Sequence, residues 1–298
     1  MNKNKRDYIK FFIVVMAIII LFGCAGCGRE NPSQQGINEE DPEQSEKISI
    51  SGDGVAEPRT FTLEEMKELR YAQFEHIYST VNNWPTRKKY AARGVLVKEL
   101  LKAAGIKDDA KSIVFVGDDE FNMPFTREQL LETDRYYFPN VLEGDSSNAV
   151  LVEPLLAYEY MEGSDDLNDV QPDDICLIVP QEDIDDQTNI AFIKNVKQIV
   201  VSTEDPGKWD LPTAFPISGE ITRGDKVKLQ HKDMSVVKIF YTIDGTDPKQ
   251  HGILYNPSTY QLDLNEPIQI DDDTVVKAFV KGFGQHDSDV ATFEYKVK

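Results

Sequence analysis

The chain has 298 residues, with 52 acidic against 32 basic side chains and a formal net charge of −20 at pH 7. A protein with this net charge repels the phosphate backbone of nucleic acids, which argues against nucleic-acid binding. The charge is consistent with a solvated extracellular surface. The length exceeds that of one ordinary domain once an N-terminal leader is set aside, so two domains are expected.

The N-terminus has the pattern of an export signal. Basic residues between Lys3 and Lys10 precede an uninterrupted apolar run over 11–22. This run is shorter than the roughly 20 residues that cross a bilayer, and it has the length of the hydrophobic region of a signal peptide. A signal peptide over 1–23 is therefore predicted, with an uncleaved signal anchor as the alternative.

Two cysteines follow the apolar run at once. The segment Leu21-Phe22-Gly23-Cys24 resembles a lipobox, in which Leu at −3 and a small residue at −1 precede a lipidated cysteine. The resemblance implies lipidation at Cys24, with Cys27 as the alternative. A protein of this kind is a lipoprotein, anchored in the cell membrane by its lipid on the extracytoplasmic face.

The segment after the cysteines has the composition of a linker. Residues 28–46 are rich in Glu, Asp, Gln, Pro, Ser and Gly and almost lack large apolar side chains. Such a stretch cannot bury enough surface to offset its ordering entropy, so a lipidated flexible tether is predicted over 24–47. Cys176 is the one cysteine beyond this region, which excludes a disulfide framework in the mature domains, and its apolar surroundings predict a buried side chain.

Regular structure is expected from residue 48 onward. The alternation over 48–52 predicts a strand, and Thr62 with Glu65 forms a capping-box pattern at the start of a helix. Apolar residues at helical spacing over 95–104 predict a second helix, which Gly105 ends.

The next segment mixes strands with short helices. Thr126 and Gln129 form another capping-box pattern. A helix is predicted over 155–161, and strands are predicted over 113–116, 175–179 and 196–201. Because these elements lack a regular βαβ rhythm, an α+β domain is predicted over 48–204.

A proline-containing linker over 205–215 precedes a change in composition. The remaining segment predicts no helix, and Asp244-Gly245 is a tight-turn signal. Strands are expected over 227–229, 236–242, 267–270, 274–280 and 291–297. An all-β sandwich is therefore predicted over 216–298.

This last segment carries a family signature. The sequence Tyr-Thr-Ile-Asp-Gly-Thr-Asp-Pro over 241–248, together with 274–279 and Tyr295, resembles the chitobiase/β-hexosaminidase C-terminal family. The resemblance implies an immunoglobulin-like sandwich that serves as an accessory module, with cell-wall carbohydrate as a partner by analogy. Asp244 and Asp247 are assigned to a turn, where Asp side chains bond nearby backbone N–H groups, rather than to catalysis.

The preceding segment resembles a second family. Gly-Val-Leu-Val-Lys-Glu-Leu-Leu over 94–101, the strand 113–116, the Val-Pro pair 179–180 and the closing 192–199 resemble, in order, the sulfite-oxidase-type molybdopterin-binding domain. The resemblance implies the α+β fold of that family over the whole of 48–204.

The family's activity depends on a cysteine thiolate that ligates molybdenum, within a Cys-x-x-Asn segment before the Gly-Val-x-Leu helix. In this chain Ser79 stands three residues before Asn82, where the family has the cysteine. The resemblance implies cofactor contacts for Ser79 and Asn82, and the basic residues Arg87 and Lys88 are the nearest candidates to hold a phosphate.

Three interpretations of this departure remain open. In the first, the domain has lost the molybdenum cofactor and serves as a binding or scaffold module. In the second, it still holds a cofactor or another small ligand, through the Ser79 oxygen or without a protein ligand. In the third, the alignment of this loop is shifted. The first interpretation predicts a cell-surface module with a small-molecule or carbohydrate ligand. The alternative is a molybdenum-cofactor-dependent oxidoreductase that acts outside the cell on a small molecule.

Overall fold

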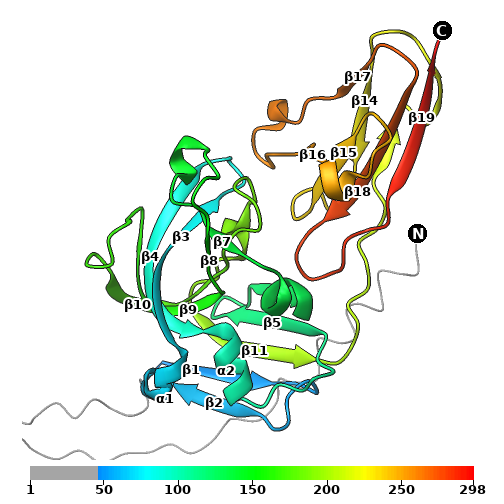
Figure 1. Cartoon of the computed structure of the whole chain (residues 1–298). Coiled ribbons are helices and arrows are strands. Elements are labelled where there is room, and N and C mark those ends of the chain that lie inside the picture. Colours follow the sequence, from blue (N-terminus) through cyan, green and yellow to red (C-terminus); the bar gives the residue numbers. More distant parts are fainter. Residues whose placement is uncertain (1–45) are drawn as a thin grey trace, which may run out of the picture. The chain divides into compact units, whose positions relative to one another are not determined.

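The computed structural model describes residues 46–298, and Figure 1 shows their elements in chain order. The predicted signal peptide over 1–23 and the lipidation candidates Cys24 and Cys27 lie outside the described residues. Within 46–298, no helix is both long and apolar enough to cross a membrane.

Five strands form the first sheet, in the order β2-β1-β11-β5-β6. Their bounds are β1 (Lys47–Ser51), β2 (Arg59–Thr62), β5 (Ser112–Gly117), β6 (Asn122–Thr126) and β11 (Val196–Ser202). Strands β1 and β11 pair in parallel, with Ile50 opposite Ile199, whereas the other pairs are antiparallel. Residues 46–202 form the central part, and the pairing of β1 with β11 joins its beginning to its end.

Four strands form the second sheet, in the order β10-β9-β4-β3. Their bounds are β3 (Gln73–Val81), β4 (Arg87–Leu96), β9 (Leu155–Glu162) and β10 (Gln171–Ile178). Fully buried residues of both sheets, among them Ile50, Val95 and Leu177, belong to one apolar core. A short two-stranded ribbon, β7 (Tyr136–Tyr137) with β8 (Val150–Leu151), completes the central part.

The helices of the central part are short. They are α1 (Leu63–Glu68), α2 (Val97–Ala103), the single turns η2 (Arg70–Ala72), η4 (Val141–Glu143) and η5 (Thr188–Ala191), and a π-helical turn, η3 (Glu128–Glu132). The capping box predicted at Thr62 and Glu65 is present in both directions. Gly105 follows α2 with φ +76°, a left-handed conformation that glycine adopts without steric cost.

The helix predicted over 155–161 is wrong, because these residues form the strand β9. Strands β4 and β10 flank β9 and take up its backbone hydrogen bonds on both edges. A short apolar run does not distinguish a buried strand from a buried helix, and tertiary pairing decides here. The second predicted helix also starts later than expected, at Val97, because Val95 and Leu96 still belong to β4.

The C-terminal part, 213–298, is built from two sheets with strand orders β12-β14-β17 and β13-β19-β18-β15-β16. The strands are β12 (Thr213–Phe215), β13 (Gly219–Ile221), β14 (Asp225–Gln230), β15 (Lys238–Thr242), β16 (Ile253–Leu254), β17 (Ile268–Ile270), β18 (Thr274–Lys281) and β19 (Ala291–Val297). Their buried residues, such as Val227, Ile239 and Val276, form a core of their own. This arrangement is consistent with the predicted β-sandwich.

Two single turns, α3 (Pro248–His251) and η6 (Leu262–Leu264), interrupt the otherwise all-β C-terminal part. The Asp244 carboxylate accepts the Thr246 N–H at 3.0 Å, and Asp247 caps α3 by accepting the Lys249 N–H at 2.9 Å. Both carboxylates therefore have the turn roles expected of them. Taken over 46–298, the structure is mostly β-sheet, so the predicted α+β character is present only as short helices.

Candidate functional site

The four residues proposed from the sequence lie in one hairpin. Ser79 is near the end of β3, Asn82 lies in the turn, and Arg87 and Lys88 begin β4, where they pair with Val81 and Thr80. The Asn82 side chain holds the turn, because its Oδ1 accepts the N–H groups of two turn residues at 2.9 Å.

The hairpin does not bring these side chains into one pocket. Ser79 is fully buried, and its Oγ accepts the backbone N–H of Phe138 at 3.0 Å. Successive residues of a strand point to opposite faces, and accordingly Arg87 forms an ion pair with Asp185 whereas Lys88 pairs with Glu162. Their role as a cofactor site stays a prediction.

The donors of this region do not fit a thiolate-ligated molybdenum cofactor. Cys176 is buried in β10, and burial raises the pKa of its thiol to about 12, so the thiol stays protonated at neutral pH. The Ser79 oxygen is already bonded to a backbone N–H in the packed interior. Within 46–298, no group of three His, Cys, Asp or Glu side chains is arranged to hold a metal ion.

A cleft of about 440 Å³ opens elsewhere, between the central and the C-terminal parts. The central part contributes the loop after β10, from Glu182 to Ile190, and the C-terminal part contributes β15, α3 and the end of β18. Its wall contains the stacked rings of Phe240 and Phe279, whose centroids are 5.6 Å apart. Residues far apart in the sequence therefore share one concave surface.

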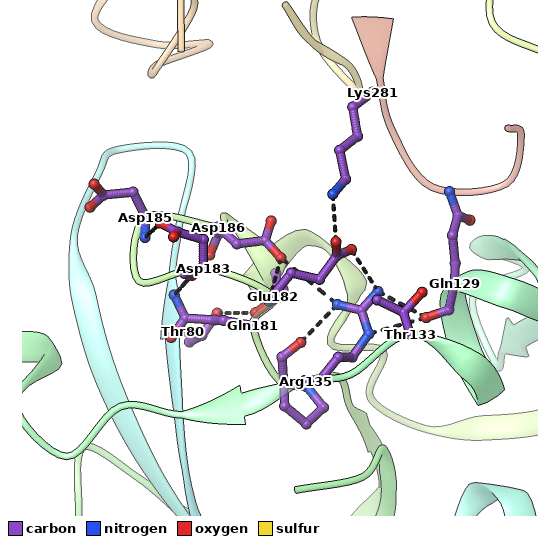
Figure 2. A network of polar contacts seen from close by, with 12 residues as sticks. Thr80, Gln129, Thr133, Arg135, Gln181, Glu182, Asp183, Asp185, Asp186 and Lys281 are labelled. Atoms are coloured by element: carbon purple, nitrogen blue, oxygen red, sulfur yellow. Dashed lines mark hydrogen bonds and ion pairs between the residues drawn. The ribbon is translucent and has the colours of Figure 1, made fainter. Parts of the chain in front are cut away.

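A network of charges lies beside this cleft, and Figure 2 shows it from close by. The guanidinium of Arg135 is completely buried and donates to the carbonyl oxygens of Gln129 and Pro180 at 2.9–3.1 Å. It also donates to Glu182 Oε1 at 3.3 Å, while Lys281 Nζ donates to the other oxygen of Glu182 at 2.6 Å. Glu182 is therefore shared between a cation of the central part and a cation of the C-terminal part.

Burial and charge act in opposite directions on Lys281. Burial disfavours its ammonium, but the carboxylates of Glu182 and Asp186 outweigh that effect and raise the pKa of Lys281 above its ordinary value. The ammonium therefore stays protonated and paired at neutral pH. Burial, followed by the neighbouring Glu182, raises the pKa of Asp186.

Gln129 also links the central and C-terminal parts through hydrogen bonds. Its Nε2 donates to the carbonyl oxygens of Gly282 and Gln285 at 2.8 and 2.9 Å, and its Oε1 accepts the N–H groups of Gly284 and Thr126 at 3.0 Å. All the hydrogen-bonding positions of one primary amide are thus used. The capping box predicted at Thr126 and Gln129 is present, and the same amide also holds the loop after β18.

Two polar groups of the cleft are incompletely bonded. Lys238 Nζ donates to the carbonyl oxygen of Asn256 at 3.2 Å, and burial lowers the pKa of Lys238 to about 8. Gln187 is only 7% exposed; its Nε2 donates to the Pro257 carbonyl, but its Oε1 has no partner within the described residues. A buried acceptor without a donor is costly, so it marks a place where a ligand gains binding energy.

Two exposed aromatic rings stand next to the cleft. Trp84 follows the cleft residue Asn83 and stacks on Tyr260 of the C-terminal part, with centroids 5.1 Å apart and planes 10° from parallel. The two residues are 51% and 64% exposed, although the Asn83 carbonyl beside them is held by the Ser258 hydroxyl at 2.9 Å. Large aromatic rings exposed beside a cleft are typical of recognition surfaces.

Sequence reasoning missed this site. The cleft residues belong to segments up to 200 residues apart, from Asn83 to Phe283, and no spacing rule joins Glu182 to Lys281. One local signal was present at Gln129, but a capping box predicts only a helix start. Arg135, in a polar loop, has no pattern that would reveal its burial.

Comparisons with known proteins found a family model and similar solved structures. Residues 227–295 match the model of the Fn3 associated family, so the similarity is confined to the C-terminal part. No curated protein matches the chain. Among solved structures, the sulfane dehydrogenase SoxCD from Paracoccus pantotrophus is similar at 12% identity and a TM-score of 0.35, over 86% of this chain and 77% of that one.

Proposed function

We propose that this chain is a cell-surface binding module, anchored through its N-terminal lipid, whose cleft between the central and C-terminal parts takes a saccharide. A sugar ring has C–H faces that stack on aromatic rings and hydroxyl edges that bond to amide and charged side chains. The observation that carries the proposal is the exposed pair Trp84 and Tyr260 beside a cleft whose Gln187 and Lys238 have unused bonding capacity.

The alternative function, molybdenum-dependent oxidation or reduction, has weaker support. It needs an accessible metal ligand, whereas the oxygen of Ser79 is bonded within the core and the thiol of Cys176 is protonated and buried. A saccharide-binding role needs neither donor.

Calorimetric titration of the full-length chain with soluble neutral and acidic oligosaccharides tests the proposal. Saturable binding is expected, and Tyr260→Ala should weaken it about five- to tenfold, because an aromatic contact contributes about 1 kcal/mol. Tyr71→Ala is the matched control, because Tyr71 is also 64% exposed but does not belong to the stacked pair beside the cleft. Absence of saturable binding by every sugar tested, or equal losses in both variants, would refute the proposal.

A further inference from the structure

The acidic groups of the cleft already have partners. Glu182 is shared between Lys281 and the buried guanidinium of the central part. Asp185 forms an ion pair with Arg87, and Asp186 Oδ2 accepts the Glu182 N–H at 3.1 Å. Each of these carboxylates already has a partner within the protein, which reduces its attraction for a cationic ligand.

One cation of the cleft differs in this respect. Lys238 has no ion pair within the described residues, and its single hydrogen bond, to Asn256, uses one of the three ammonium donors. Asn256 is itself fixed, because its side chain bonds the backbone N–H of Ile239 at 2.7 Å and the carbonyl of Val237 at 2.8 Å. The ammonium is therefore held in place with donors to spare.

Gln187, the other incompletely bonded residue of the cleft, bonds to the same short segment of chain as Lys238. Gln187 Nε2 donates to the carbonyl of Pro257, and Lys238 Nζ donates to the carbonyl of the preceding residue, Asn256. The two carbonyls belong to adjacent residues, so both side chains are anchored at residues 256–257. Both line the same cleft. One cleft thus contains a cation with free donors and an acceptor that has no donor within the described residues.

From this pairing we infer that the saccharide of the cleft is acidic, with a carboxylate bound by Lys238 and a hydroxyl or amide N–H donated to Gln187 Oε1. The inference rests on the proposed function and names the class of its ligand. A singly charged carboxylate suits the site better than a doubly charged phosphate, because the carboxylates of Glu182 and Asp186 line the same cleft and repel the higher charge more strongly. Exposed Lys249 at the same cleft adds a further positive charge.

Titration of the full-length chain with a galacturonic acid trimer and with its methyl ester isolates the charge, since the ester differs only in the neutralised carboxylates. The acid should bind at least tenfold more tightly than the ester. Lys238→Met should abolish that difference while keeping the ester's affinity, which also shows that the variant is folded. Lys226→Met, at an exposed position of β14, is the matched control and should change neither affinity.

The outcomes separate the inference from the proposed function. Equal binding of acid and ester, unchanged in Lys238→Met, would overturn the acidic class while leaving saccharide binding in place. Failure of both ligands, and of the neutral and acidic oligosaccharides above, would overturn both proposals. A galactose 1-phosphate arm distinguishes the anion, because tighter binding of the phosphate than of monomeric galacturonate would contradict the carboxylate assignment.

Discussion

Removing the charge of Glu182 should loosen the contact between the central and C-terminal parts. Glu182→Gln keeps the shape of the side chain. Within 46–298 it leaves the completely buried Arg135 with Asp186 as its one carboxylate neighbour, at 3.8 Å. The same change removes the partner of Lys281 at 2.6 Å.

The size of the effect follows from burial. Breaking a buried pair costs about 3–5 kcal/mol, and a hydrogen bond to a charged group is worth about 1.5–3 kcal/mol. Arg135 keeps its bonds to two backbone carbonyls, and Glu182 is itself one-quarter exposed, so solvent offsets part of the loss. We therefore expect the free energy of unfolding to fall by about 2 kcal/mol.

Urea unfolding, followed by tryptophan fluorescence and circular dichroism, measures this change. Glu132→Gln is the control, because it removes one exposed pair with Arg127 at 2.7 Å and should cost less than about 1 kcal/mol. A double-mutant cycle of Glu182→Gln with Lys281→Met should give a coupling free energy of about 1 kcal/mol. Equal losses for Glu182→Gln and Glu132→Gln, or a coupling near zero, would refute the account of this network.

Three further predictions concern metal, lipid and pH. The chain produced in a host that makes and exports the molybdenum cofactor should contain no stoichiometric molybdenum by elemental analysis. Ser79→Ala should lower the free energy of unfolding by about 1–3 kcal/mol, because the Phe138 N–H loses its acceptor. One molybdenum per chain, lost in Ser79→Ala, would make Ser79 a ligand. Metabolic lipid labelling should disappear in Cys24→Ser, whereas persistence there and loss in Cys27→Ser would move the site. The folded-state pKa of Lys238 is lowered to about 8, so above that pH the unfolded chain binds more protons than the folded chain. The free energy of unfolding should therefore rise from about pH 8 toward pH 10 relative to Lys238→Met. A constant difference across this range would contradict the burial of that ammonium.

Local patterns predicted much of the fold because their causes are local. The capping boxes at Thr62 and Thr126 and the left-handed stop at Gly105 depend on side chains within four residues, and each is present. Most of the predicted strands follow from short apolar runs or from alternating polarity, which the sequence displays directly.

The failures have non-local causes. Residues 155–161 became a strand because β4 and β10 lie on either side of them. The hairpin of β3 and β4 was not predicted, because three consecutive basic residues, 87–89, begin β4 and interrupt the alternation of apolar and polar side chains. The cleft depends on contacts such as Gln129 with Gly284, which are 155 residues apart in the sequence. Whether 48–204 and 216–298 fold independently stays a prediction.

Hydrogen exchange of the full-length chain, with and without the galacturonic acid trimer, tests saccharide binding in the cleft most directly. The account predicts slower exchange over 182–190 and 236–257, the segments that carry Gln187, Lys238 and their carbonyl partners. The acidic turn over 163–169 lies outside the cleft and should exchange at an unchanged rate. Protection confined to other segments, or none at saturating trimer, would contradict the account.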